Sequence, residues 1–124
     1  METNENTRSK GVKGEEVAAD YLAAKGFKIV KKNYFSGRYE IDIIAENDTQ
    51  VVFVEVKTRS SNNYGEPWEA VNKQKQRKIC YGADNYIRQS QNMKEPRFDI
   101  ISVVHSGGKT EVLHLENAFY PTMY

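Results

Sequence analysis

Alternation of apolar and polar positions predicts two neighbouring strands near the middle of the chain. Residues 40–46 and 51–57 are rich in Ile and Val, and the intervening segment 47–50, Asn-Asp-Thr-Gln, is typical of a turn. We therefore expect an antiparallel hairpin. Its second strand is apolar on both faces until its last residues, which indicates a central position in a sheet.

Apolar residues three and four positions apart predict a helix on each side of this hairpin in the sequence. The first covers Lys13–Lys25, with Gly26 as its stop signal, and the second begins at Pro67 and ends near Gln89. Shorter strand-like runs occupy 27–31, 97–104 and 111–115. The α-β-β-β-α-β order predicts an α/β fold with a mixed central β-sheet of four to five strands flanked by two main helices.

The length of 124 residues suits a single compact domain. We predict a flexible N-terminal arm at 1–12, one domain at 13–118 and a C-terminal tail at 119–124. No apolar run approaches the roughly 18 residues that would indicate a membrane span, and the polar N-terminus lacks the apolar segment of a signal peptide. We therefore expect a cytoplasmic protein without a membrane partner, whose one cysteine, Cys80, is a packed thiol.

The net charge of +1 neither favours nor excludes nucleic acid, but the charges are unevenly distributed. Two stretches contain basic residues and no acidic ones: Lys25, Lys28, Lys31, Lys32 and Arg38 in the first, and Lys73, Lys75, Arg77 and Lys78 in the second. Together they could form a surface that faces phosphate groups. The alternative is that each stretch is an ordinary solvated face.

Acidic side chains interrupt the apolar faces of both hairpin strands. Because side chains alternate along a strand, Glu40, Asp42 and Ile44 share one face of the first strand, opposite to Ile41 and Ile43. In the second strand, the face that begins with Val51 and Phe53 continues into Glu55 and Lys57. An acid and a base at the end of a central strand are not ordinary solvent-side residues.

The register of the hairpin decides whether two of these carboxylates meet. If Glu46 faces Val51 across the turn, Asp42 lies opposite Glu55, with about 4.5–5.5 Å between their Cβ atoms. A slip of one residue would turn one carboxylate to the other face. Opposed carboxylates raise each other's pKa, and a hard divalent cation between them relieves the repulsion. We therefore predict a Mg²⁺ (or Mn²⁺) site at this pair.

Lys57 follows Glu55 on the same face, and its ammonium could stabilise charge in a phosphoryl transition state or assist an attacking water. The same register places Glu40 opposite Lys57. An ordinary Glu40–Lys57 pair with Asp42 in solvent is therefore the alternative interpretation, and the residues alone leave both open.

Two further charged residues interrupt apolar stripes on the predicted helices. Glu15 lies on the inward face of the first helix, where a carboxylate is costly to bury unless it is paired or bound to metal. A first-turn Glu that favours the helix N-terminus is the alternative. Lys75 lies four residues after Val71 and four before Ile79, so it could reach the acidic face of the hairpin or extend to solvent.

The remaining candidates are weaker. His105 and His114 lie in or beside the last strands without a nearby nucleophile, so we do not expect them to be catalytic. Tyr34, Phe35 and Tyr64 lie near basic residues in expected loops, where exposed aromatic rings could stack on bases.

Several of these segments together resemble the YraN-like family of bacterial proteins. The resemblance covers about residues 11–104 and rests on these motifs: Gly14-Glu15-x-x-Ala18-x-x-Tyr21-Leu22, Glu40-Ile41-Asp42, Val52-Phe53-Val54-Glu55-Val56-Lys57-Thr58-Arg59, Tyr64-Gly65, Ala70-Val71, Lys75 and Arg97-Phe98-Asp99. This uncharacterised family is grouped with the restriction-endonuclease-like fold and is similar to archaeal Holliday-junction resolvases, which are metal-dependent homodimers. The family usually has Gly before the Glu-Ile-Asp motif, where this chain has Tyr39, so close approach of another backbone there is altered.

The resemblance implies which residues act. Glu15, Asp42 and Glu55 match acidic metal-binding positions, Lys57 matches a catalytic lysine, and Lys75 matches a family lysine without an assigned role. These four, Glu15, Asp42, Glu55 and Lys57, are the expected catalytic residues. The residues expected to bind nucleic acid are Lys31, Lys32, Arg38, Arg59, Lys73, Lys75, Arg77 and Lys78.

The leading functional hypothesis is a Mg²⁺-dependent nuclease, a hydrolase of phosphodiester bonds in structured or branched DNA, which could act as a homodimer. A non-catalytic nucleic-acid-binding module on the same fold is the first alternative. A protein-interaction scaffold is the second, and the near-neutral net charge keeps it open.

Overall fold

A computed structural model describes residues 4–60 and 71–120 of the protein. Along the chain it contains α1 (Asn4–Ala24), β1 (Lys28–Ser36), β2 (Tyr39–Glu46), β3 (Gln50–Ser60), α2 (Lys73–Ser90), β4 (Glu95–Ser106) and β5 (Lys109–Leu115). The predicted α/β architecture, a mixed sheet with two main helices, is confirmed.

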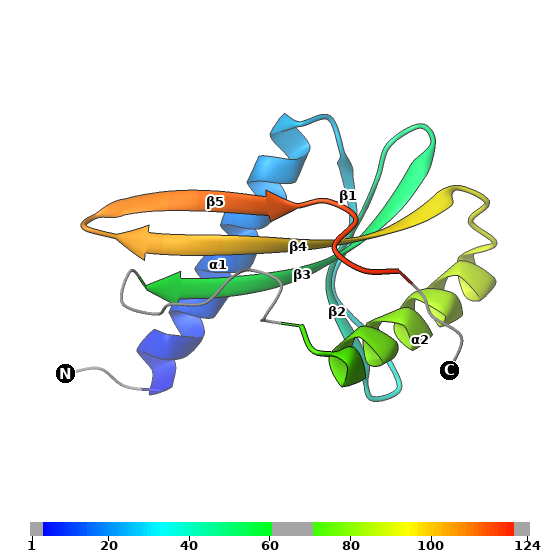
Figure 1. The fold of residues 1–124 in the computed structure, drawn as a ribbon, viewed down its shortest axis with the longest axis horizontal. Coiled ribbons are helices and arrows are strands. Elements are labelled where there is room, and N and C mark those ends of the chain that lie inside the picture. The colour runs from blue at the N-terminus through cyan, green and yellow to red at the C-terminus, as the bar shows by residue number, and fades with distance from the viewer. Residues whose placement is uncertain (1–3, 61–70, 121–124) are drawn as a thin grey trace.

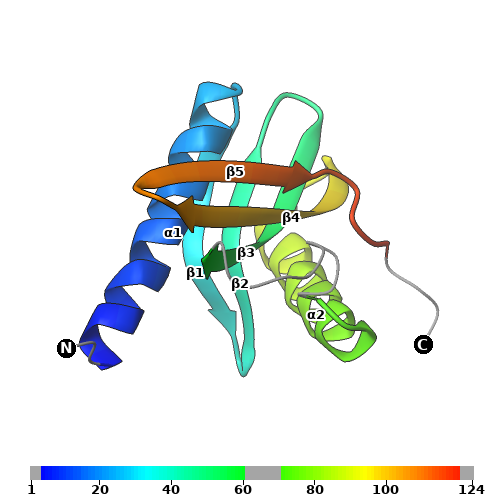
Figure 2. The same ribbon diagram turned by 60° about the vertical axis from the view of Figure 1, so that its left-hand side comes forward.

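The strands form one five-stranded sheet in the order β1-β2-β3-β4-β5, so β3 is the central strand, as its two apolar faces predict. β3 and β4 run parallel, and the other neighbouring pairs are antiparallel. The sheet is strongly twisted: in Figure 1, β1 and β2 run steeply across the direction of β3, β4 and β5. The helices lie on opposite sides of the sheet, which the turned view of Figure 2 also shows.

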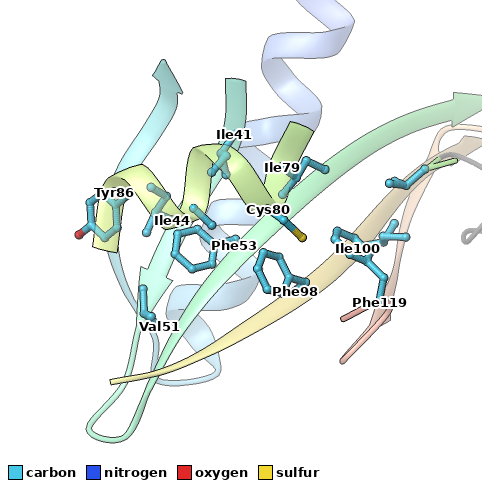
Figure 3. Packing of buried hydrophobic residues seen from close by; sticks show 12 residues of the cluster. Ile41, Ile44, Val51, Phe53, Ile79, Cys80, Tyr86, Phe98, Ile100 and Phe119 are labelled. Atoms are coloured by element: carbon cyan, nitrogen blue, oxygen red, sulfur yellow. The ribbon is translucent and has the colours of Figure 1, made fainter. Parts of the chain in front are cut away.

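Each helix covers its own hydrophobic cluster. Between α2 and the sheet lie, among others, Ile41, Ile44, Phe53, Ile79, Tyr86, Phe98 and Ile100, several of which are drawn in Figure 3. Between α1 and the sheet lie Ala18, Leu22, Ile43, Val52, Val54, Ile101 and Val103, among others. Cys80 belongs to the first cluster with 6% of its surface exposed, so the predicted packed thiol is confirmed.

The C-terminal end of α1 follows the predicted stop signal. Gly26 has φ of 97°, its N–H donates to Ala23 O, and the N–H of Phe27 donates to Leu22 O. This is the Schellman arrangement, in which a residue of positive φ closes the helix and the next residue packs back on it. Leu22 and Phe27 both lie in the cluster under α1, so the stop also sets how β1 begins.

The N-terminal end of α1 differs from the prediction, because the helix begins at Asn4 and not at Lys13. Most of the arm predicted at 1–12 is therefore helical. Residues 4–12 are almost entirely polar, so they contain no apolar period by which a helix could be recognised. They also contain no proline, and nothing in them interrupts a helix extending from the packed part.

α2 begins later than expected, at Lys73, after the N-cap residue Asn72. The Oδ1 atom of Asn72 accepts a 2.8 Å hydrogen bond from the backbone N–H of Lys75, as a capping side chain does. The predicted start at Pro67 lies within 61–70, outside the described residues. Neither described helix is long and apolar enough to cross a membrane.

The end of the chain differs in a smaller way. Phe119, placed in the tail by the sequence, is 6% exposed and packs at 5.3 Å between ring centroids on Phe98. Its neighbour Ala118 donates a backbone hydrogen bond to Phe98 O. The core therefore extends one residue beyond the predicted boundary at 118.

Candidate metal centre

The two hairpin carboxylates lie where β2 and β3 separate. The antiparallel register pairs Glu46 with Val51, as assumed from the sequence, and continues to the pair Ile43–Val54. The ladder ends there, although β2 remains paired with β1 and β3 with β4. One further step would place Asp42 opposite Glu55, so these residues occupy the opening of the fork between the strands.

Asp42 fills this opening with its side chain. Its Oδ2 atom accepts a 2.8 Å hydrogen bond from the backbone N–H of Val56 in β3. The alternation of faces breaks at the same point, because Ile41 and Ile44 both pack under α2. The expectation that Ile41 faces the opposite side to Ile44 was therefore wrong. Across β1, Asn33 lies between the residues that pair with Ile41 and Ile43 and has a positive φ of 50°, which marks an irregularity next to Asp42.

Burial and neighbouring charges make Asp42 hard to ionise. Only 7% of its surface is exposed. Desolvation, followed by the negative charge of Glu55, raises its pKa from 3.8 to about 8; Glu15 and Glu40 act in the same direction, against the hydrogen bond from Val56. A bound cation would oppose this shift, because an opposite charge nearby stabilises the ionised form of a carboxyl group.

Glu15 reaches the same region from α1. The helix can approach β3 closely because Gly14 has no side chain; a Cβ atom there would overlap Thr58 Oγ1. Desolvation raises the pKa of Glu15, as do the charges of Glu40 and Glu55, against a hydrogen bond with Asn33 and the charge of Lys32. Glu15 is thus electrostatically part of the acidic cluster.

Lys75 reaches the cluster from the other side of the sheet. Its Nζ atom lies 2.8 Å from Oε1 of Glu55, whose side chain is 10% exposed, whereas the Lys75 side chain is 47% exposed. Desolvation would lower the pKa of Lys75, but the hydrogen bond to Glu55 and the charges of Glu55, Asp42 and Glu40 outweigh it and raise the pKa. Of the two possibilities left open by the sequence, Lys75 therefore points to the acidic face.

Lys57 and Glu40 do not form the alternative pair. Glu40 lies opposite Phe35 of β1, and the ladder between β2 and β3 ends before it. Asp42 is buried rather than in solvent, so the ordinary cross-strand interpretation does not hold. Lys57 is exposed, two residues beyond Glu55 in β3.

The chemistry of these residues fits a hard divalent cation in part. Asp42 and Glu55 offer carboxylate oxygens from two adjacent strands, and Mg²⁺ is commonly held by one or two carboxylates completed by water and phosphate. Within 4–60 and 71–120, however, no three His, Cys, Asp or Glu side chains converge into a metal-binding group. Glu15 therefore affects the charge of the cluster without completing a three-residue ligand set in this arrangement.

The residues expected to bind nucleic acid lie mainly at the surface. Lys31 and Lys32 are exposed on β1, Arg38 is exposed in the turn before β2, and Arg59 is half-buried near the end of β3. The others are exposed in the first turns of α2: Lys73, Lys75, Arg77 and Lys78. α2 has no acidic residue in its first turn, so its N-terminal end is positive from both side chains and backbone.

Some contributors to the acidic cluster were not predicted. Asn33 was missed, although its positive φ and its hydrogen bond with Glu15 set it beside the carboxylates. Glu40 was assigned to a pair with Lys57, yet it adds negative charge around Glu15 and Asp42. The residue type is the sequence signal that could have indicated the irregularity at Asn33, because Asn adopts positive φ more readily than most residues.

A second buried polar cluster was also missed. Asp99, fully buried in β4, lies 2.7 Å from Nε2 of His114 and accepts hydrogen bonds from Arg97 at 2.8 and 3.0 Å and from the backbone N–H of Asn117 at 3.1 Å. His114 Nδ1 lies 3.2 Å from Tyr21 Oη in α1. This cluster ties α1 to β4 and β5, and it lacks the acidic character of the Asp42 site.

The family model and the similar proteins found by comparison all have the same family description. Residues 14–103 match the family described as "Uncharacterised protein family UPF0102". A UPF0102 protein of Caldanaerobacter subterraneus is 49% identical over 119 residues, covering 92% of this chain and 97% of its own. A UPF0102 protein of Bacteroides fragilis is 39% identical over 114 residues, covering 92% and 94%. One from Syntrophomonas wolfei is 40% identical over 113 residues, covering 90% and 98%.

Proposed function

This chain belongs to the uncharacterised protein family UPF0102, and from that starting point we propose that it is a Mg²⁺-dependent nuclease acting on structured or branched DNA. The observation that carries the proposal is the buried Asp42 next to Glu55 in the fork between β2 and β3. Burial, followed by the charge of Glu55, raises the pKa of Asp42 to about 8, so the protein itself does little to stabilise this carboxylate in its ionised form. Perturbed carboxyl groups of this kind are characteristic of functional sites.

Each residue of the site has its own role in this proposal. Asp42 and Glu55 would hold the ion, with Glu15 adding negative charge from α1. A divalent ion bound there supplies Lewis-acid stabilisation of charge on a phosphate. Lys57 is exposed two residues beyond Glu55 in β3, and it would contact the phosphate that undergoes cleavage. The exposed basic residues at the start of α2 and on β1 would bind neighbouring phosphates.

A cleavage assay with matched variants tests the proposal. The wild type, Asp42→Ala, Glu55→Ala and Asp48→Ala are incubated with a four-way DNA junction and Mg²⁺ or Mn²⁺. Asp48 is the control, because it is exposed in the turn of the same hairpin at the end away from the fork. We expect divalent-dependent cleavage by the wild type and Asp48→Ala, and a loss of about 100-fold or more in the other two.

Metal binding is measured by calorimetry on the same proteins. We expect it to vanish in the Asp42→Ala/Glu55→Ala double variant and to persist in Asp48→Ala. Cleavage at equal rates by all four proteins would refute the assignment of the site. Salt-dependent DNA binding without cleavage, unchanged by Asp42→Ala, would instead identify a binding module.

A further inference from the structure

An ion pair joins the half-exposed, flexible side chain of Lys75 to the buried carboxylate of Glu55. Nζ of Lys75 lies 2.8 Å from Oε1 of Glu55, and the lysine side chain is 47% exposed against 10% for the glutamate. The backbone of Lys75 is fixed by the Asn72 cap, whose Oδ1 accepts its N–H at 2.8 Å. The ammonium thus extends from a fixed point at the start of α2 into the acidic cluster.

In the described part of the chain, the one ion pair that Glu55 makes is with Lys75. A buried carboxylate is unfavourable without a cation, since desolvation acts against its charge. Lys75 therefore neutralises the charge of Glu55, as a metal ion bound to this carboxylate would.

We propose that Lys75 is a displaceable counter-ion, which holds Glu55 in the metal-free protein and gives way when a divalent cation binds Asp42 and Glu55. Its ammonium then becomes available to a phosphate of the nucleic acid. This inference rests on the proposed function, because it needs the cation to bind at these two carboxylates.

Charge balance supports displacement. When Asp42 gives up its proton to water on metal binding, a divalent cation neutralises the charges of Asp42 and Glu55 by itself, so the charge of Lys75 becomes surplus. Mg²⁺ sits about 2.0–2.1 Å from carboxylate oxygens, which would bring it within a few ångströms of the ammonium, where like charges repel strongly. The Lys75 side chain is half-exposed, so its ammonium can rotate into water once a cation takes its place beside Glu55.

The surroundings of Lys75 indicate where its ammonium goes. Lys73, Arg77 and Lys78 are exposed on the same part of α2, and the first turn has no acid. A phosphate drawn to this surface would compete with Glu55 for Lys75. Metal and phosphate should therefore each increase the affinity of the protein for the other. A metal ion frees Lys75 from Glu55 for the phosphate, and a phosphate that binds Lys75 frees Glu55 for the metal ion.

Metal titration of the full chain without DNA tests the first step. Mn²⁺ binding is measured by calorimetry on the wild type, Lys75→Gln, Lys75→Arg and Lys78→Gln. Lys78 is an exposed lysine on the same helix, so its variant has the same net charge as Lys75→Gln. We expect Lys75→Gln to bind Mn²⁺ about tenfold more tightly than the wild type, with Lys75→Arg and Lys78→Gln within about twofold of it.

The results separate this inference from the proposed function. Equal or weaker binding by Lys75→Gln would overturn it, since Lys75 would then support the metal site or stand aside from it. Equal tightening in Lys75→Gln and Lys78→Gln would show a general charge effect and would also overturn it. Absence of Mn²⁺ binding in both the wild type and Lys75→Gln would refute the metal site itself.

A second measurement uses the unmodified protein and does not depend on the folding of a variant. Acetylation of lysines by an amine reagent is followed by mass spectrometry with and without Mg²⁺. We expect Mg²⁺ to accelerate acetylation of Lys75 severalfold and to leave Lys78 unchanged. An unchanged rate at Lys75, under conditions where calorimetry shows the metal bound, would mean that the ammonium stays on Glu55 and would overturn the proposal.

Discussion

Asp42 and Asp99 are buried aspartates in one sheet, and their surroundings move their pKa in opposite directions. Asp42 meets burial and the charge of Glu55, which raise its pKa to about 8. At Asp99, desolvation also acts to raise the pKa, but hydrogen bonds from His114, Arg97 and the backbone of Asn117 outweigh it and lower the pKa. The protein thus stabilises Asp99 in its ionised form, whereas it stabilises Asp42 in its protonated form.

The raised pKa of Asp42 predicts that the protein loses stability as pH rises. The folded state keeps a proton that the unfolded chain releases near pH 4, so stability falls between about pH 4 and pH 8. Asp42→Asn removes this dependence. At pH 9 we expect the free energy of unfolding of the variant to be larger than that of the wild type by on the order of a few kcal/mol, since each pKa unit corresponds to about 1.4 kcal/mol.

Urea unfolding from pH 5 to pH 9 measures this difference, with Asp48→Asn as an exposed control. Added Mg²⁺ should reduce the difference in stability between Asp42→Asn and the wild type at high pH. An ion that binds only the folded state stabilises it, and the wild type keeps the Asp42 carboxylate that binds the ion. Parallel stability curves for the wild type and Asp42→Asn would contradict the assigned environment of Asp42. Asp99 has the reverse sign: its contribution is present above its unfolded pKa and is lost as pH falls through the lower folded value.

The proximity of two site residues could be predicted where a short turn joins their strands. Asp42 and Glu55 are joined by a short turn, and strand alternation with one assumed pair, Glu46–Val51, was enough to bring them together. Asn33 and His114 act through contacts with distant segments, Glu15 and Asp99 respectively, for which no periodic pattern exists. Their contacts could be seen only in the folded chain.

At the scale of elements, the packing of α1 on β3 positions Glu15. Gly14 lies against Thr58, and a methyl group at residue 14 would overlap Thr58 Oγ1. We expect Gly14→Ala to destabilise the protein by about 1–3 kcal/mol, as overpacking of a tight contact does, and to weaken metal-dependent activity by shifting Glu15. Chemical unfolding and the cleavage assay measure the two effects.

A compensating substitution distinguishes this contact from the ordinary effect of Gly in a helix. Alanine has the higher helix propensity, so without the contact Gly14→Ala would stabilise α1. Thr58→Ala removes the overlapping oxygen, and Gly14→Ala/Thr58→Ala should recover most of the lost stability. A stabilised single variant, or a double variant no better than the single one, would contradict the proposed packing.

The helices also show which boundaries the sequence could predict. The end of α1 was predicted because Gly26 marks it with a residue type that tolerates positive φ. The start predicted at Lys13 was wrong, and α2 as described begins at Lys73, whereas Pro67 lies outside the described residues. Residues 4–12 have no apolar period, and Pro67 was a stronger start signal by residue type than Asn72, whose capping role depends on the neighbouring Lys75 N–H.

At the scale of the whole molecule, basic residues from distant segments reach the acidic centre: the charge of Lys32 acts on Glu15, and Lys75 contacts Glu55. The net charge of +1 conceals this arrangement. We expect DNA binding measured in Ca²⁺ to weaken steeply with salt, and Lys73→Gln/Lys78→Gln to lower the slope of log K against log salt by about 2. Fluorescence anisotropy with a four-way junction measures the slope.

The control for this prediction is Lys109→Gln, an exposed lysine at the start of β5. It should leave the slope within about 0.5 of the wild type if the start of α2 is the phosphate surface. Equal changes in both variants would indicate binding spread over the molecule. No salt dependence in any protein would favour the scaffold interpretation.

The hydrogen bond across the fork has a spectroscopic consequence. The N–H of Val56 donates to Oδ2 of Asp42 at 2.8 Å, in place of a backbone carbonyl. In an isotopically labelled sample, the amide resonance of Val56 would thus respond directly to whatever happens at that carboxylate, whether it gains a proton, an ion or a different rotamer. A single peak in a proton–nitrogen correlation spectrum would follow the occupancy of the centre without a substrate, a dye or a substitution.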